Sequence, residues 1–359
     1  MKNSLGTSII LTLFGESHGQ SIGAVLDGMP AGIKVNEEFL KSQLAKRRPN
    51  GKTSTQRIEQ DNYEILSGVF KGVTTGAPIC LLIKNESVRS QDYDEEMMRP
   101  SHADYVAHVK YDGHNDYRGG GHFSGRLTAP IVALGSICLK QLEAKGIKLG
   151  THILKCGDVE DPNFDNYQKE IDELNSKEYP LISSREEELE NQILKVKEQG
   201  DSIGGVLQTA VIGLPVGLGE PWFSSLEGEI ANAMFSIGGV KGIEFGKGFG
   251  FAKGLGSELN DALYFDGEQV KTKSNNNGGI NGGISNGMPV VFNLAVKPTP
   301  SIAKDQDSIN LKTKENVKVS VKGRHDPAII RRLPVVINSL LAILLCDELA
   351  KRYGVDYLK

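Results

Sequence analysis

The sequence predicts an α+β protein in which antiparallel sheets pack against buried helices. Strand-like and helix-like segments come in runs along the chain and do not alternate strictly, which is typical of this fold class. Residues 127–142 and 333–346 are apolar on almost every face, so both are expected to form helices inside the molecule. Sheets that enclose these helices, or neighbouring subunits, would cover them.

Besides the buried helix at 127–142, the first half of the chain contains three predicted strands and two predicted helices. Apolar runs bounded by glycine or proline predict strands at 8–14, 21–26 and 78–84. Asn36 is a suitable N-cap for a helix that runs to about residue 46. Ser101 opens a further helix to about residue 110, with Asp104 at the capping-box position.

The second half contains predicted strands at 206–212, 289–296 and 317–321, and a charged surface helix at about 185–199. Asp326 and Pro327 are residue types preferred at the cap and first position of a helix, so the last buried helix is expected to begin there. No linker-like segment interrupts the chain, and we expect one domain over residues 1–359.

Composition excludes several classes of protein. Of the 359 residues, 39% are hydrophobic and 24% are charged, as in soluble globular proteins. The net charge of -4 gives no general positive field for nucleic acid, so an anion must be met by local cations. The most hydrophobic stretch is too short for a membrane span, and the N-terminal apolar run is too short for a signal peptide. The four scattered cysteines predict reduced thiols. We expect a cytoplasmic protein with neither membrane nor nucleic-acid partners.

Residues 99–126 concentrate residue types that bind anions and move protons. Besides three arginines and three consecutive glycines, this stretch holds four of the seven histidines, namely His102, His108, His114 and His122. Histidine exchanges protons near neutral pH, arginine binds phosphate, and glycine lets a backbone approach a ligand closely. The histidine spacings lack the close pair of a catalytic zinc site, so no metal is predicted. His102 is the best candidate, because it begins a predicted helix beside Arg99 and Asp104.

Residues 15–19 (GESHG) match the nucleophile elbow of α/β-hydrolases, with Ser17 as the nucleophile. A strand-and-turn pattern follows where the elbow requires a helix, so a polar turn is the better interpretation. The segments NGKTS and GKGFG each lack a glycine that phosphate-binding and dinucleotide-binding loops require.

Two further segments leave alternatives open. Asp326 is either a helix cap or, beside Arg324 and His325, an ionised carboxylate able to accept a proton. The segment from Lys297 to Ser301 (KPTPS) is either a stiff turn or a loop that offers hydroxyls and an ammonium group to a phosphate.

Seven motifs carry a resemblance to a known family. They are GESHGQSIGAVLDGMPAG (15–32), RRP (47–49), RPSHAD (99–104), RGGG with SGR (118–126), GDSIGG (200–205), GGINGGISNG with KPTPS, and GRHDP (323–327). They follow the family's order across almost the whole chain, although 162–199 and 253–272 are not recognisable. On these residues, the chain resembles the chorismate synthases.

The resemblance implies an anti 1,4-elimination that converts 5-enolpyruvylshikimate 3-phosphate to chorismate and phosphate. The reaction requires reduced FMN without net oxidation. The lost hydrogen is not next to a carbonyl, so a base alone would face a weak carbon acid, and the difficult chemistry belongs to the cofactor. Because the substrate carries a phosphate and two carboxylates, arginines should converge on it. The candidates for binding substrate or NADPH are Arg47, Arg48, Arg57 and Arg126.

Matching motifs also imply individual roles. His18 would supply a proton to the leaving phosphate, His102 would stabilise the reduced flavin, and Asp326 would be the base. Ser17 and Ser124 would relay protons. The residues implied for FMN are His122, Phe123, Ser124, Gly238, Gly239, Gly282, Lys297, Pro298, Thr299, Pro300, Ser301 and Arg324.

Two departures from the family pattern stand out. Many members read R-S-S-A-R where this chain has HFSGR, so the flavin contacts of His122 and Phe123 are expected to differ in kind. Others have one more arginine where this chain has Lys46. Some members reduce their own flavin with NADPH through basic residues near Arg47. Lys52 matches that pattern only loosely, so self-reduction and external reduction remain alternatives.

The family fold is a β-α-β-α sandwich that forms a homotetramer, in agreement with two covered helices. Two rival functions are weighed against this lyase. One is a serine hydrolase that uses Ser17, and the other is a flavin-binding or scaffold protein without turnover.

Overall fold

Two five-stranded sheets form the frame of the molecule. A computed structural model of the chain describes residues 2–49, 51–54, 59–86, 93–177, 179–321 and 326–359. The first sheet has the order β1 (Ser4–Leu5), β2 (Ile10–Gly15), β3 (Ser21–Asp27), β7 (Ile79–Lys84) and β4 (Tyr63–Ser67). The second has the order β11 (Val240–Phe245), β16 (Val290–Val296), β10 (Gly205–Ile212), β8 (Lys148–Cys156) and β9 (Val159–Glu160). Their strand pairs are antiparallel, which confirms the predicted α+β class.

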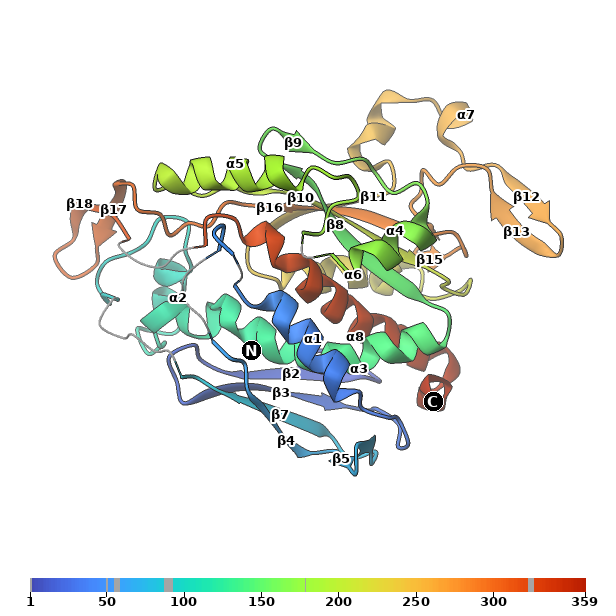
Figure 1. Cartoon of the computed structure of the whole chain (residues 1–359), viewed down its shortest axis with the longest axis horizontal. Coiled ribbons are helices and arrows are strands. Elements are labelled where there is room, and N and C mark those ends of the chain that lie inside the picture. Colours follow the sequence, from blue (N-terminus) through green and yellow to red (C-terminus); the bar gives the residue numbers. More distant parts are fainter. Residues whose placement is uncertain (1, 50, 55–58, 87–92, 178, 322–325) are drawn as a thin grey trace.

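Three helices lie between the two sheets (Figure 1). They are α1 (Glu37–Arg47), α3 (Thr128–Ala144) and α8 (Leu333–Tyr353). Helix α3 packs closely on α8 because Gly135 has no side chain: a Cβ there would lie 2.6 Å from the Ser339 Cβ. One hydrophobic core runs through these helices and the inner faces of both sheets. The prediction of two buried helices is confirmed.

Both buried helices are also apolar enough to cross a membrane by length and composition alone. For α8, 94% of its most apolar window is buried inside the molecule; for α3 with the turns before it, the share is 67%. Burial of this kind is what core helices of globular proteins show.

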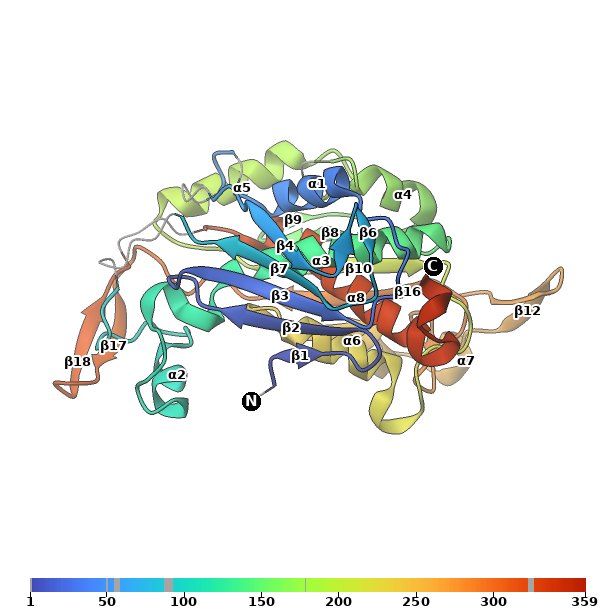
Figure 2. The same cartoon turned by 90° about the horizontal axis from the view of Figure 1, so that it is seen from below.

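The outer face of the second sheet carries α4 (Tyr167–Leu174), over a smaller hydrophobic cluster that includes Phe164 and Ile171. Helix α5 (Glu186–Glu198) lies beside β9, and α6 (Leu226–Phe235) contacts both α8 and β11. Helix α2 (Asp104–Lys110) and the hairpin of β17 (Gln306–Asn310) and β18 (Glu315–Val319) lie side by side at one end of the molecule (Figures 1 and 2).

At the opposite end, α7 (Gly256–Leu259) and the hairpin of β12 (Leu263–Asp266) and β13 (Gln269–Thr272) project from the body (Figure 1). Two smaller hairpins are β5 (Val69–Phe70) with β6 (Val73–Thr74), and β14 (Ile280–Asn281) with β15 (Ile284–Ser285).

Most predicted elements are confirmed within one or two residues, among them β2, β3, β7, β10, β16, α1 and α5. The predicted cap of α1 is confirmed as well, since the Asn36 side chain accepts a hydrogen bond from the Phe39 N–H at 2.9 Å. The free thiols are confirmed: Cys80, Cys138, Cys156 and Cys346 form no disulfide.

Two predicted helix starts are wrong. Helix α2 begins at Asp104, three residues later than predicted, because the Asp104 carboxylate binds Arg99 and His102 instead of capping the helix. Helix α8 begins at Leu333, after a short 3-10 turn at Ile329–Arg331, so Asp326 is not its cap. The Asp326 carboxylate instead pairs with Arg332. Sequence reasoning also missed β8, β11, α4 and α6.

Candidate active site

The three consecutive glycines form a seat for two histidines from distant parts of the chain. Gly119, Gly120 and Gly121 all have positive φ angles, of 61°, 81° and 51°. A Cβ at Gly119 would lie 2.1 Å from the His18 ring, and a Cβ at Gly120 would lie 3.3 Å from the His102 ring. Only glycine combines this backbone with such close contact. The loop thus brings His18 and His102 to adjacent positions.

His18 is held by the residue before it. The Ser17 Oγ lies 3.1 Å from the His18 Nδ1 and also 3.0 Å from the Gly119 carbonyl, to which it can donate its one proton. The His18 Nδ1–H can then donate to Ser17, which fixes the ring's orientation. The His18 ring also contacts Tyr93 edge-on, with centroids 5.2 Å apart.

The same geometry argues against the serine hydrolase. Ser17 is fully buried, its hydroxyl faces backbone carbonyls, and strand β3 follows where the nucleophile elbow requires a helix. A nucleophilic serine needs an accessible oxygen and a base that accepts its proton. The hydrolase alternative is therefore wrong.

The His102 ring is hydrogen-bonded to the Asp104 carboxylate, which also forms an ion pair with Arg99. The His102 Nδ1 donates to the Asp104 Oδ1 at 2.6 Å, while the Arg99 Nε and Nη2 donate to Asp104 at 2.7 Å each. Burial alone would raise the pKa of Asp104, but the hydrogen bonds from His102 and Arg99 outweigh it and hold that pKa well below its ordinary value. Asp104 is thus ionised at neutral pH and orients the His102 ring.

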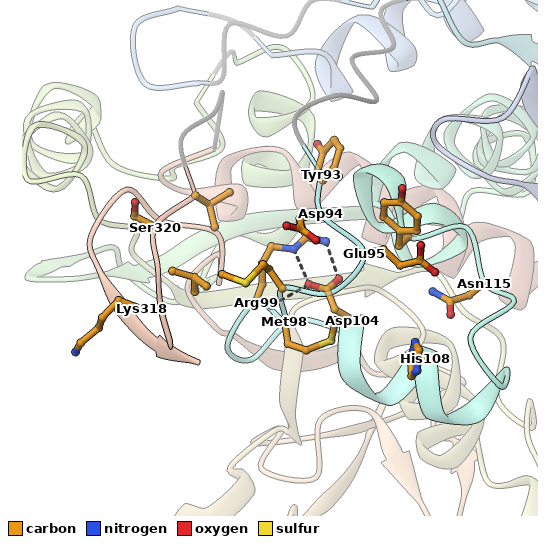
Figure 3. Close-up of a pocket in the computed structure, with 14 residues that line it drawn as sticks. Tyr93, Asp94, Glu95, Met98, Arg99, Asp104, His108, Asn115, Lys318 and Ser320 are labelled. Atoms are coloured by element: carbon orange, nitrogen blue, oxygen red, sulfur yellow. Dashed lines mark hydrogen bonds and ion pairs between the residues drawn. The ribbon is translucent and has the colours of Figure 1, made fainter. Parts of the chain in front are cut away.

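The Arg99–Asp104 pair also borders a cavity of about 440 Å³ (Figure 3). Its walls come from the segment of residues 93–99, from α2, from Asn115 and Tyr117, and from the end of β18 with the two residues after it. The segment of residues 115–126 connects this cavity to a second one. The first residues of the segment line this cavity, its glycines pack against both histidines, and its last residues line the second cavity.

That second cavity, of about 240 Å³, contains Asp326 and Ser124. The Asp326 Oδ2 accepts a bond from the Arg332 Nη1 at 2.6 Å, while the buried Oδ1 has no hydrogen-bond partner within the described part of the chain. A buried carboxylate oxygen with an unused lone pair can accept a proton from a ligand. Asp326 lines a cavity and does not cap α8, so the helix-cap interpretation is wrong, and the proton-accepting role stays a prediction.

Arg47 and Arg126 also line this cavity, but both form ion pairs with Asp61. The Arg47 Nη2 donates to Asp61 at 2.8 Å, and the Arg126 Nη1 donates to the other carboxylate oxygen. Burial raises the pKa of Asp61, but the two guanidinium groups outweigh it and lower that pKa. Burial lowers the pKa of Arg47 to about 10. Asp61, together with Glu59 at 3.8 Å from Arg126, therefore neutralises most of the charge that these arginines would offer a substrate. Sequence reasoning missed Asp61 as a residue of the candidate site.

The other predicted arginines lie elsewhere. Arg48 lines a different cavity, on the other side of Arg332. Arg57 and Arg324 lie outside the described residues.

Some of the residues predicted for flavin binding, among them Ser124, line the Asp326 cavity. Gly238 lines it, and the Gly239 carbonyl accepts a bond from the Lys297 N–H at 2.9 Å. The Lys297 Nζ donates to the Ser101 carbonyl at 2.6 Å, next to His102. Gly282 lies away from Gly238, at the other end of α6. Gly282 follows β14 beside the N-terminal end of that helix, whereas Gly238 follows its C-terminal end.

The remaining predicted flavin contacts differ in accessibility. The His122 Nδ1 donates to the Gly15 carbonyl at 2.8 Å and so ties the two histidine-bearing loops together. Phe123 is exposed. The segment that holds Pro298, Pro300 and the buried Ser301 also holds Thr299. The Thr299 Oγ1 is buried and has no hydrogen-bond partner among the residues that the structure describes. That orphan hydroxyl fits a ligand group.

Comparison with known proteins identifies the family of the chain. The sequence model of the chorismate synthase family matches residues 9–350. The chain belongs to the chorismate synthase family.

Among curated chorismate synthases, that of Methanocaldococcus jannaschii is 44% identical over 98% of this chain and 97% of its own length. That of Korarchaeum cryptofilum is 43% identical over 96% and 97%. A solved structure titled "Crystal Structure of Chorismate Synthase" superposes with a TM-score of 0.76 at 32% identity, over 97% of this chain and 94% of that one. The reaction of the family is the loss of phosphate from 5-enolpyruvylshikimate 3-phosphate to give chorismate, so the chain is a lyase of the shikimate pathway.

Proposed function

We propose that the chain carries out this elimination with reduced FMN in the space bounded by the glycine loop, Ser124 and Asp326. One observation carries the proposal: the segment that seats His18 and His102 ends in Ser124, which shares a cavity with the unpaired oxygen of Asp326. An elimination needs a group that gives a proton to the leaving group and a group that takes one from carbon. In this proposal His18 and Asp326 supply the two.

The residues near Asp326 fit a flat ring system with polar edges. Ile237, Ile329 and Leu333 give the cavity an aliphatic wall, while the orphan Thr299 hydroxyl and the Lys297 ammonium lie in the predicted flavin segment. Ligand sites commonly combine an apolar wall with a few placed polar groups. Reduced FMN, when bound, would lend and recover electron density while the carbon–oxygen bond to phosphate breaks.

The protein's own side chains would then donate and accept the protons and stabilise the charges. His18 donates a proton to the departing phosphate, with its ring oriented by Ser17. His102, held by Asp104, provides a charged or donating ring beside the cofactor. Asp326 accepts the proton that leaves carbon, with Ser124 between the two sides. We keep Arg47, Arg48, Arg57 and Arg126 as proposed contacts for the substrate or for NADPH.

An anaerobic assay tests this proposal. The chain, FMN reduced with dithionite and 5-enolpyruvylshikimate 3-phosphate should give chorismate and an equal amount of phosphate. No product under these conditions would refute it, and flavin binding without turnover would favour the scaffold alternative. A parallel assay with NADPH in place of dithionite tests whether the chain reduces its own flavin.

We also propose a homotetramer, located in the cytoplasm and without membrane or nucleic-acid partners. The projecting arm of residues 249–270 supports assembly, because it exposes large apolar side chains, among them Phe249, Leu255, Leu263, Phe265 and Val270. An isolated two-stranded hairpin is at best marginally stable in water, and exposed apolar patches mark interfaces.

Assembly would also account for Gly282. The ten residues of α6 separate it from Gly238 by roughly 15 Å at 1.5 Å per residue. We therefore propose that Gly282 contacts the flavin of a neighbouring subunit. The sheet–helix–sheet–helix layering supports the β-α-β-α sandwich, and the continuous core supports one domain over residues 1–359.

A further inference from the structure

The positive charges of the Asp326 cavity are matched by carboxylates. Arg47 and Arg126 pair with Asp61, Arg126 also lies 3.8 Å from Glu59, and Arg332 pairs with Asp326. Buried ions are stable only when such partners neutralise them. This cavity therefore has little unopposed charge.

A third cavity, which Arg332 also lines, is rich in positive charge. It encloses about 330 Å³ between the end of α1, the loop after α4 and the start of α8. We call it the basic cavity, because its walls include five cations, Lys46, Arg48, Lys177, Arg331 and Arg332. Among the described residues that line it, there is no aspartate or glutamate.

Most of the contacts that hold these cations in place are neutral. The Lys46 Nζ donates to the Asn175 carbonyl at 2.5 Å, and the Lys177 Nζ donates to the Leu181 carbonyl at 2.8 Å. The Arg331 guanidinium donates to Thr53 at 2.9 Å and lies over the Tyr179 ring at 4.1 Å. Carbonyls, hydroxyls and aromatic rings orient a cation but do not cancel its charge.

Three further observations concern Arg48, Lys46 and Lys177, whose charges no carboxylate among the described lining residues neutralises. The Arg48 Nε is buried and has no hydrogen-bond acceptor among the described residues. Partial desolvation lowers the pKa of Lys46, although the residue as a whole is exposed, so its ammonium form is somewhat destabilised where it stands. The carboxylate nearest to Lys177 is Glu186 at 3.8 Å, a partly exposed pair of little strength.

We propose that the basic cavity is a second anion-binding site, which takes a phosphate or phosphate-ester group. Guanidinium and ammonium groups converging from three segments suit a compact dianion with several acceptor oxygens. Arg332 lines both cavities, and its Nη1 pairs with the Asp326 carboxylate at 2.6 Å. An anion in the basic cavity would therefore affect Asp326 through the Arg332 guanidinium. Because Arg48 is also a proposed contact for the substrate or NADPH, this proposal rests on the proposed function, whereas anion binding in the basic cavity needs neither flavin nor turnover.

Calorimetric titration with inorganic pyrophosphate tests the proposal, at about 0.15 M salt, where charges beyond roughly 8 Å are screened. Ser176→Glu places a carboxylate on the wall of the basic cavity at an exposed serine, and Lys46→Gln removes one cation. Ser257→Glu, on exposed α7, is the matched charge control. The wild-type chain and the control should bind pyrophosphate alike. Each of the two cavity variants should raise the Kd of the basic cavity for pyrophosphate at least tenfold.

Two results would overturn the proposal. One is wild-type binding that is absent at millimolar pyrophosphate. The other is binding that Ser176→Glu and Lys46→Gln both leave unchanged while their melting temperatures match the wild type, because the anion would then sit elsewhere, for example in the Asp326 cavity.

Discussion

Asp104 links the two best-defined side chains of the site, since it accepts bonds from His102 at 2.6 Å and from Arg99 at 2.7 Å. We predict that Asp104→Asn lowers kcat on the order of 10- to 100-fold, as loss of a carboxylate that orients a functional histidine does. The shape of the pH–rate profile should change too, which a purely structural role would not cause. Asp201→Asn, which removes an exposed partner of Lys304, is the control and should keep the wild-type profile. A wild-type profile in Asp104→Asn would exclude this positioning role.

Asp61 has a structural role that can be tested by stability. Asp61→Asn leaves Arg47 and Arg126 buried without their carboxylate and should cost about 3–5 kcal/mol in the free energy of unfolding. Because folding lowers the pKa of Asp61, its contribution is present above the unfolded value of about 3.9 and is lost as pH falls through the lower folded value. Urea unfolding should therefore show a large difference at pH 7 that shrinks below about pH 4. Asp172→Asn, at an exposed pair with Lys148, should change stability by no more than about 1 kcal/mol.

At the scale of elements, the glycine loop determines where both histidines sit. An alanine Cβ at Gly119 would overlap the His18 ring, so Gly119→Ala should displace the imidazole and lower kcat about 100-fold, the cost of a misplacement of about 1 Å. Gly146→Ala has the same kind of positive φ, 75°, with no atom within 4 Å of the added Cβ. It controls for backbone strain, and equal losses of activity in the two variants would contradict the seating role.

The elements also show what the sequence could and could not predict. The core helices were predictable because α3 and α8 are apolar all round, and the start of α1 because Asn36 is a local cap. The starts of α2 and α8 were not, because Asp104 and Asp326 form ion pairs with residues outside the local cap pattern. Strand β8 was missed since it is buried on both faces for much of its length and lacks alternation.

The site was predictable only in part for the same reason. His18, His102, Ser124 and Asp326 were identified through their motifs. The partners Asp61 and Tyr93 were not, because their roles arise from contacts between segments far apart in the chain, such as the 65 positions between Asp61 and Arg126. No periodicity or spacing reports such a pair.

At the scale of the whole molecule, the projecting arm should hold the assembly together. Replacing Leu263 and Phe265, which are 71% and 77% exposed, with serine should give a smaller species in size-exclusion chromatography with light scattering. Phe70→Ser changes an equally exposed phenylalanine, 67%, on the β5–β6 hairpin and is the control. An unchanged mass for the arm variant would mean that assembly uses another surface.

The claim that segments from both ends of the chain meet at one reaction centre is tested most directly by Asp326→Asn in the anaerobic assay with reduced FMN. Asparagine keeps the shape of the side chain and its contact with Arg332 but cannot accept the proton. We predict that kcat falls by about 10²–10⁴-fold, the usual contribution of general acid–base catalysis, while the melting temperature stays close to the wild-type value. A variant that turns over at nearly the wild-type rate would contradict the account.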